Sequence, residues 1–398
     1  MFHSRVSVPV PSTPTVEDIF SSALSTLFTD DTQICHGVPR QSVYYDSPRF
    51  GRISLRIPAH PDFEEGRRLF AHYLWNSGVI VADAIESASV PESNNNVRDS
   101  ACAEVSISRD DNQDQSDDEW NNRYWDVRGR RTLELGAGTA LPSLISALSG
   151  AKSVTITDHP SSPALTMGAI EQNVRDNLRR PKAEATTAEQ NVGDNADVNK
   201  SRPGPPPGPV FHEQDTDAEP NGVEGSGLKS NADSPFKINA DISVYSYTWG
   251  TSTFYLPSSY GKLAPSQPEA FDRIIIADCL WMPSQHVNLC KTILRYLDPL
   301  DPDSCALVVA AFHTGRSIVR NFFEVATGEY KVENLEGRDE DEDEDVDEEI
   351  RAVKGKLRAA EIFEIDTNAV RRPWEPVRPK EDKHMAKRWC VCAVLVRR

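Results

Sequence analysis

Residues 131–158 read RTLELGAGTALPSLISALSGAKSVTITD. The apolar run TLEL predicts a buried strand, and Gly136 and Gly138 predict a turn after it. The next segment has leucines at helical spacing and ends at Gly150, so it predicts a helix. The run SVTIT predicts a second strand, which ends at Asp158. These elements form one βαβ unit with parallel strands, and we expect the rest of the chain to be organised around it.

The glycine turn and the carboxylate at the end of this unit predict a ligand-binding site. Because Gly136 and Gly138 lack Cβ atoms, a ligand can lie against their main chain, and the helix behind them directs free N–H groups toward it. Asp158 lies at the carboxyl end of a parallel strand, where open α/β sheets bind ligands. A carboxylate there can accept hydrogen bonds from both hydroxyls of a ribose. We therefore expect a cofactor that contains a nucleoside.

Two classes of cofactor compete for this site. Asp158 lies 20 positions beyond Gly138 (158 − 138 = 20), a spacing close to that of a dinucleotide-binding fingerprint. However, Leu141 occupies the place of the third glycine of G-x-G-x-x-G. The looser methyltransferase pattern, an acidic residue followed by G-x-G, is present as Glu134, Gly136 and Gly138. With an acidic residue at each end of the unit, the pattern favours a cofactor loop over a purely structural turn.

The composition limits the partners and the compartment. The chain has 398 residues and a net charge of −18, so we expect a basic protein surface rather than nucleic acid as its partner. Seven cysteines are scattered without a C-x-x-C pair, which argues against a zinc site or a disulfide framework and for a reducing compartment. No signal peptide and no apolar run long enough to span a bilayer are found. We therefore expect a soluble cytoplasmic protein with no metal and no membrane partner.

Composition also divides the chain into parts. Residues 1–42 are rich in Ser, Thr and Pro and predict a disordered N-terminal segment, whereas residues 43–398 predict one α/β domain. Three stretches within this domain lack apolar periodicity, at about 90–122, 181–235 and 338–345. Such segments cannot bury enough apolar surface to offset the entropy of ordering. We therefore expect three disordered insertions.

Seven strands are predicted once the insertions are left aside. They are expected to start near residues 131, 153, 238, 271, 305, 330 and 388. The first five alternate with helices or crossovers, which indicates a parallel sheet, and the last two are expected to pair as an antiparallel hairpin. We also expect a β-hairpin at 43–60, one helix at 163–180 and another at 349–365. The predicted fold is α/β, a Rossmann-like seven-stranded sheet with helices on both faces and an antiparallel final strand, as in a class I methyltransferase.

Four motifs resemble the seven-strand, S-adenosylmethionine-dependent methyltransferases of the protein lysine methyltransferase family. They are LELGAGTALPS from Leu133, TDHP from Thr157, YTWG from Tyr247 and FDRIIIADCLWMPSQH from Phe271. Within that family, the sequence resembles a fungal nicotinamide N-methyltransferase-like group. That group is similar to the methyltransferase that acts on the N-terminus and a lysine of translation elongation factor 1-alpha. The resemblance covers about 43–85, 124–178, 238–335 and 386–397.

The resemblance implies S-adenosyl-L-methionine as the cofactor. The residues that match the family's cofactor contacts are Trp75, Gly136, Ala137, Gly138, Asp158, Trp249 and Ala277. On the side of the methyl acceptor, the candidates for catalysis are Asp278, Trp281 and His286, with Tyr247 and His313 also near carboxyl ends of strands.

Two departures from the family's pattern bear on this site. Ala140 stands at the last place of the generic G-x-G-x-G loop. Family members that act on the elongation factor have an Asn-His pair shortly after the strand-four aspartate, whereas here Asp278 is followed by CLWMPSQH. The second departure leaves the methyl acceptor open.

The resemblance therefore implies an enzyme, an S-adenosylmethionine-dependent N-methyltransferase of a protein lysine or N-terminal amine. Its substrate is expected to be a protein such as a translation factor, and the enzyme is expected to be a monomer. Three alternatives stay open. They are a nicotinamide N-methyltransferase acting on the small molecule, a non-catalytic protein of the same fold that holds a basic partner through its acidic segments, and a dinucleotide-dependent oxidoreductase, which Leu141 disfavours.

Overall fold

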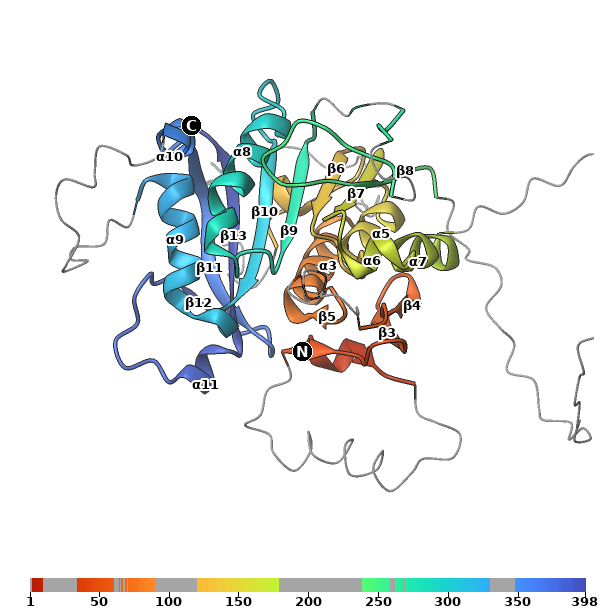
Figure 1. Cartoon of the computed structure of the whole chain (residues 1–398). Helices are drawn as coiled ribbons and strands as arrows, with labels where there is room; N and C mark the ends of the chain where they lie inside the picture. The colour runs from red at the N-terminus through yellow and green to blue at the C-terminus, as the bar shows by residue number, and fades with distance from the viewer. Residues whose placement is uncertain are drawn as a thin grey trace, which may run out of the picture. The chain divides into compact units, whose positions relative to one another are not determined.

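The computed structural model describes part of the chain, drawn in colour in Figure 1. The described residues are 2–9, 34–60, 64, 66, 69, 71–90, 120–178, 238–257, 262–265, 267, 270–329 and 348–398. The predicted insertions at 181–235 and 338–345 lie outside them, as does the stretch 91–119 of the first insertion and the strand predicted near residue 330. At the end of the first predicted insertion, Trp120 is ordered, because its ring packs on Trp125, with 4.8 Å between the ring centroids.

A mixed sheet is the centre of the domain, with the strand order β12-β11-β13-β10-β9-β6-β7-β8. Five of its strands are parallel to one another, as predicted: β6 (Arg131–Leu135), β7 (Ser153–Asp158), β8 (Asp241–Ser246), β9 (Arg273–Ala277) and β10 (Cys305–Ala311). The last strand, β13 (Trp389–Arg397), runs antiparallel to β10. This order confirms the class I methyltransferase fold. The chain order reverses between β6 and β9, which is the switch point where open α/β sheets bind ligands.

A segment that the sequence predicts as a helix forms a further strand of the sheet. The predicted helix at 349–365 is a short helix, α10 (Glu348–Val353), followed by the strand β11 (Leu357–Asp366), so the second half of that prediction is wrong. β11 pairs antiparallel with β13, on the edge of β13 that faces away from β10. A central strand needs backbone hydrogen bonds along both edges, and this requirement prevails over the helical spacing of the segment. An eighth strand, β12 (Arg371–Pro373), adds to β11 at the edge, where a proline is tolerated.

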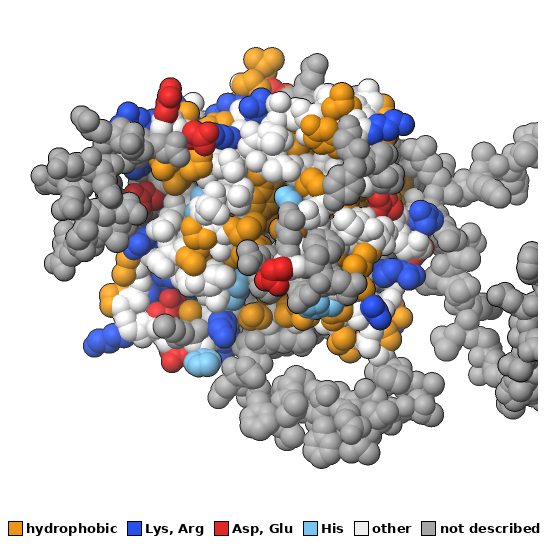
Figure 2. Space-filling view, in the orientation of Figure 1, with side chains coloured by type: hydrophobic (Ala, Val, Ile, Leu, Met, Phe, Trp, Pro, Cys, Tyr) orange, Lys and Arg blue, Asp and Glu red, His pale blue; other side chains and the backbone are white. Residues whose placement is uncertain are grey.

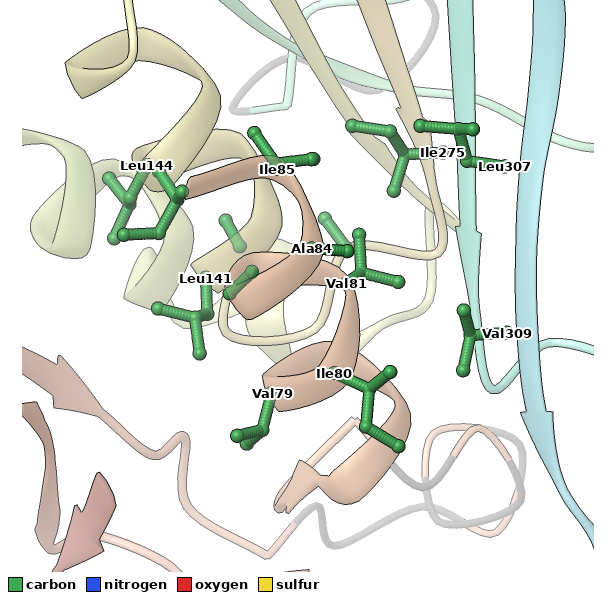
Figure 3. Packing of buried hydrophobic residues seen from close by; sticks show 14 of the residues in the cluster. Val79, Ile80, Val81, Ala84, Ile85, Leu141, Leu144, Ile275, Leu307 and Val309 are labelled. Carbon is green, nitrogen blue, oxygen red and sulfur yellow. The ribbon is translucent and has the colours of Figure 1, made fainter. Parts of the chain in front are cut away.

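Helices cover both faces of the sheet (Figure 1). The helices α3 (Asn76–Ala88) and α5 (Leu141–Leu148) pack on one face, and α8 (His286–Tyr296) and α9 (Arg316–Thr327) pack on the other. Since successive strand residues point to opposite faces, Ile275 of β9 joins the first layer. Figure 3 shows α3 between α5 and the sheet, with Val81 and Ile85 toward Ile275. This packing fixes α3, whose N-terminal end lies at the binding site described below.

Short segments of the predicted disordered N-terminus are ordered. The strand β1 (Val6–Ser7) pairs with β3 (Ser42–Ser47), which forms the predicted hairpin with β4 (Gly51–Arg56). The strand β2 (Cys35–His36) pairs with β5 (Leu74–Trp75). The segment docks because Phe2 is buried in the core, and residues 10–33 lie outside the described part. The helix predicted at 163–180 is two helices, α6 (Pro163–Thr166) and α7 (Ala169–Asn177), because Gly168 between them takes a left-handed conformation.

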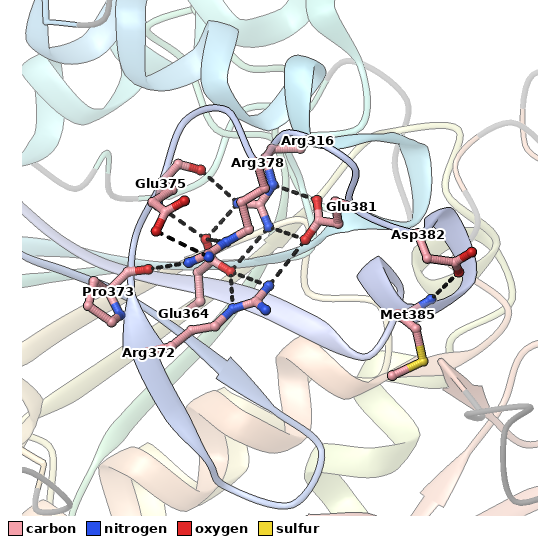
Figure 4. Close-up of polar contacts among 9 residues, drawn as sticks. All are labelled: Arg316, Glu364, Arg372, Pro373, Glu375, Arg378, Glu381, Asp382 and Met385. Carbon is pink, nitrogen blue, oxygen red and sulfur yellow. Dashed lines mark hydrogen bonds and ion pairs between the residues drawn. The ribbon is translucent and has the colours of Figure 1, made fainter.

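A buried ion-pair network ties α9 to β11, β12 and the segment before β13 (Figure 4). The Glu364 side chain is fully buried, and it pairs with Arg316, Arg372 and Arg378. Arg316 places one guanidinium nitrogen 2.6 Å from a Glu364 oxygen and another 2.6 Å from a Glu381 oxygen. Buried charges persist only where they are paired in this way. The network therefore fixes the C-terminal strands against the helix that follows β10.

Candidate active site

A cavity lies where β6 and β9 are neighbours, at the carboxyl ends of the parallel strands. All seven predicted cofactor residues line it: Trp75, Gly136, Ala137, Gly138, Asp158, Trp249 and Ala277. Of the three candidate catalytic residues, Asp278 and Trp281 line it and His286 does not. Figure 2 shows hydrophobic side chains gathered toward the middle of the face drawn there, with most Lys and Arg side chains nearer its edges.

The two glycines of the loop have different roles. Gly136 has φ +71°, and a Cβ there would lie 2.8 Å from the Sγ of Cys279 and 3.3 Å from the ring of Trp249. Only glycine fits this close approach of strand ends. Gly138 has φ +53° and no atom within 4 Å of where its Cβ would be. Its open side lines the cavity, so a cofactor can lie directly against the main chain, and the loop fits a nucleoside cofactor.

Asp158 is already oriented by backbone hydrogen bonds. The Gly138 N–H donates to its Oδ2 at 2.8 Å, and the His159 N–H donates to its Oδ1 at 2.7 Å. Burial raises the pKa of this carboxyl, while these two amide donors oppose the rise. Each carboxylate oxygen keeps a second acceptor site. Asp158 can therefore accept from ribose hydroxyls without giving up the contact that shapes the glycine loop.

Glu134 is a buried carboxyl behind the same loop. The backbone N–H of Ser143 donates to its Oε2 at 3.1 Å, and the Ser143 hydroxyl donates to the same oxygen. These bonds fasten the first turn of α5 to β6. Burial nevertheless dominates and raises the pKa of Glu134 to about 8. The side chain is therefore largely protonated in the folded protein at neutral pH.

The raised pKa of Glu134 predicts that stability falls as pH rises. Between the unfolded pKa, about 4.3, and the folded pKa, about 8, the folded state holds a proton that the unfolded state has lost. The free energy of unfolding should therefore fall with a slope approaching about 1.4 kcal/mol per pH unit in that window. We expect Glu134→Gln to remove this contribution. Urea denaturation of both proteins at several pH values, without cofactor, checks this, and parallel pH profiles for the two would contradict it.

Asp278 has an unusual backbone conformation in the wall of the cavity. Its φ is +60°, which is uncommon for a residue with a side chain. The Ala311 N–H donates to its Oδ1 at 3.2 Å. Burial raises the pKa of the carboxyl. The side chain thus lies in the cavity wall, fixed against the end of the neighbouring strand.

His286 does not reach the cavity. Its side chain is buried, with Nε2 donating to the Leu280 carbonyl at 2.8 Å and its ring set edge-on to Phe322. Burial lowers the pKa of the ring. His286 holds the turn after Asp278 from behind, because the first residue of α8 faces the protein interior. Its position next to a strand end in the sequence could not reveal which way it points.

Several further residues complete the cavity. Tyr73, His159, Met282 and Gln285 line it. Met282 and Gln285 lie in the segment that follows Asp278, and His159 is the third residue of the TDHP motif. Their closeness in the sequence to predicted site residues could have indicated that they line the cavity. Tyr73 had no such signal, since it depends on the pairing of β5 with β2.

Fungal relatives are similar to this chain. A protein N-terminal and lysine N-methyltransferase of Gibberella zeae is 24% identical over 271 residues, which cover 67% of this chain and 69% of the relative. A Neurospora crassa protein of the same name is 24% identical over 318 residues, covering 76% and 78%. One from Schizosaccharomyces pombe is 37% identical over 107 residues, covering 27% and 28%. No protein-family model matches the chain.

Solved structures give only a distant likeness. A structure described as a SAM-dependent methyltransferase from Streptococcus mutans has 11% identity and a TM-score of 0.29, and covers 68% of this chain and 45% of that one. Another, in complex with S-adenosylhomocysteine, has 11% identity and a TM-score of 0.30, with 68% and 46% covered. These values carry no argument about the fold, which rests on the strand order given above.

Two further observations concern the described residues alone. Within those ranges, no group of three or more His, Cys, Asp or Glu side chains is placed to hold a metal ion. No helix of the described part has the length and apolar character needed to cross a membrane.

Proposed function

We propose that this homologue of the fungal protein N-terminal and lysine N-methyltransferases transfers a methyl group from S-adenosylmethionine to an amine of a protein. One observation carries the proposal. One wall of the cavity contains the glycine loop and Asp158, a carboxylate placed where such sheets bind a ribose. The second wall of the same cavity contains Asp278 and Trp281. The first wall suits the cofactor and the second suits the methyl acceptor.

On the cofactor side, the chain provides binding and orientation. Gly138 allows the cofactor to approach the main chain closely, and Asp158 offers acceptor sites to ribose hydroxyls. Trp75 and Trp249 line the same region with aromatic surface. When bound, the cofactor supplies a methyl group on a sulfonium cation. Holding the acceptor in line with that group can supply several kcal/mol, up to about 7–11, of the barrier.

On the acceptor side, the chain provides a dry, aromatic wall. An amine must be neutral to attack, and an apolar environment lowers its pKa. Trp281 and Met282 line this part of the cavity with apolar surface, and aromatic faces attract a methylated ammonium by roughly 0.5–2 kcal/mol. Asp278 lies in the same wall and can accept a hydrogen bond from the amine.

The acceptor is expected to be a basic protein rather than nicotinamide. The net charge of −18 favours encounter with a basic surface, and it offers nothing to a neutral small molecule. A translation factor as substrate, a monomeric enzyme, a cytoplasmic location and the absence of a nucleic-acid partner complete the proposal. Saturable methylation of nicotinamide at ordinary rates would support the small-molecule alternative instead.

Trp281→Ala tests the assignment of the acceptor wall. We expect the rate of methyl transfer to protein to fall by about tenfold, since a lost aromatic contact is worth about 1 kcal/mol or more in a desolvated site. The affinity for S-adenosylhomocysteine, measured by titration calorimetry, should stay within about twofold. Val377 is exposed, so Val377→Ala is the control and should change neither the rate of methyl transfer nor the affinity. Equal losses in affinity and rate for Trp281→Ala would move this residue to the cofactor side.

A further inference from the structure

His313 lies behind the cavity, next to one residue of each wall. It belongs to the single turn η3 (Phe312–Thr314) that directly follows β10. Its ring stacks on the indole of Trp75, with 5.0 Å between ring centroids and 22° between ring planes. Its Nδ1 lies 3.8 Å from the Oδ1 of Asp278. Since Trp75 and Asp278 both line the cavity, His313 contacts the site from behind.

The sheet fixes this arrangement. Ala277 of β9 pairs with Val309 of β10, so the residues that follow each strand emerge side by side. The Asp278 N–H donates to the Val309 carbonyl at 2.8 Å, and the Ala311 N–H donates to the Asp278 carboxylate at 3.2 Å. The carboxylate is therefore held toward the end of β10, close to His313 in the turn that follows this strand.

His313 is the less buried member of the pair. Its side chain is 13% exposed, against 5% for Asp278. Its Nδ1 is buried and has no hydrogen-bond partner among the residues that the structure describes. A buried, unpaired polar atom is uncommon and calls for an explanation. A distance of 3.8 Å is longer than a hydrogen bond, but catalytic hydrogen bonds are often long before substrate binds.

Other titratable groups around this pair do not compete with it. Cys35, opposite Trp75 in the β2–β5 pair, and Cys390, opposite Ala311 in β13, both have a pKa raised by burial and are neutral thiols. The guanidinium of Arg316 is engaged by Glu364 and Glu381. Within the described part of the chain, His313 is thus the group placed to exchange a proton with Asp278.

We propose that Asp278 and His313 form the path by which the proton of the substrate ammonium leaves the cavity. The inference rests on the proposed function. An N–H bond of the ammonium breaks and an O–H bond forms on Asp278, which leaves a neutral amine to attack the methyl group. The proton then passes to Nδ1 of His313, and the imidazolium so formed releases a proton from Nε2 to solvent. Because burial favours the protonated carboxyl, Asp278 can hold the proton in transit.

His313→Phe separates this path from a purely structural role. Phenylalanine keeps an aromatic face for Trp75 but cannot carry a proton. Since His313 acts through Asp278, it is a positioning residue, and the readouts are chosen accordingly. They are S-adenosylhomocysteine affinity and the initial rate of labelled methyl transfer from S-adenosylmethionine to proteins of a fungal lysate, measured over a range of pH. The exposed His384→Phe is the matched control.

The path predicts a distinctive pattern for His313→Phe. Affinity should stay within about twofold of the wild type, whereas transfer near neutral pH should fall by at least about tenfold. The rate should recover as the pH approaches about 10, where a lysine arrives already neutral. A loss that is equal at every pH, or no loss at all, would overturn the path. If His313→Phe loses affinity, His313→Gln repeats the comparison. A wild-type enzyme that labels no protein would instead contradict the proposed function itself.

Discussion

Asp158→Ala is expected to weaken binding of S-adenosylhomocysteine by about 1.5–3 kcal/mol, roughly 10- to 150-fold, the range for hydrogen bonds to a charged group. The carboxylate has two tasks in the structure. It offers acceptor sites to the ribose, and it holds the Gly138 N–H at 2.8 Å, so its removal also loosens the glycine loop. Titration calorimetry at neutral pH measures the change.

Two further variants make the Asp158 experiment specific. Asp158→Asn keeps the shape and one acceptor oxygen, so it should lose less affinity than Asp158→Ala. Asp176 is an exposed carboxylate of α7 that, among the described residues, accepts a hydrogen bond from Gln172. The Asp176→Ala variant should bind the ligand like the wild type. Wild-type affinity in Asp158→Ala, with an intact thermal transition, would remove Asp158 from the site.

Arg316→Ala is expected to lower the free energy of unfolding by up to about 3–5 kcal/mol, because it breaks two buried ion pairs and leaves Glu364 with fewer compensating charges. The Arg316 side chain is 8% exposed and pairs with both Glu364 and Glu381. Glu364 is fully buried and, among the described residues, would keep the guanidinium groups of Arg372 and Arg378 and the backbone N–H of Glu375. Urea denaturation at pH 7 measures the loss.

An exposed ion pair provides the contrast. Arg52 donates to Asp46 at 2.8 Å, but its side chain is 59% exposed, so solvent and salt screen the attraction. Arg52→Ala should therefore leave stability almost unchanged. If the two variants lost stability to the same extent, the buried network would not be what fixes the C-terminal strands to α9.

The centre of the fold could be predicted from the sequence because local signals agree there. In residues 131–158, strand runs, the glycine turn, helical spacing and Asp158 all point to one βαβ unit, and the structure has it. The strand β11 could not be predicted in the same way. Leu357–Asp366 has apolar residues that suit either a helix or a strand, and its conformation is decided by the free edge of β13. A tertiary partner of this kind leaves no local signal.

The candidate site divides along the same line. Residues within recognisable motifs, such as Gly136 and Trp249, could be assigned to the cavity before the structure was known. The direction in which a single side chain points could not be assigned from the sequence. His286 faces the interior, although its place beside a strand end suggested the cavity. The neighbourhood of Asp278 and His313 likewise depends on the register of β9 against β10.

The proposed methylation of a protein amine can be measured directly. The purified chain is incubated with labelled S-adenosylmethionine and a fungal lysate, with nicotinamide in a parallel reaction, and labelled products are identified by mass spectrometry. Asp158→Ala serves as the cofactor-binding control. We expect label on a lysine or N-terminal amine of a protein, little or none on nicotinamide, and a large loss with the variant. Labelled nicotinamide at ordinary enzyme rates, with no labelled protein, would contradict it.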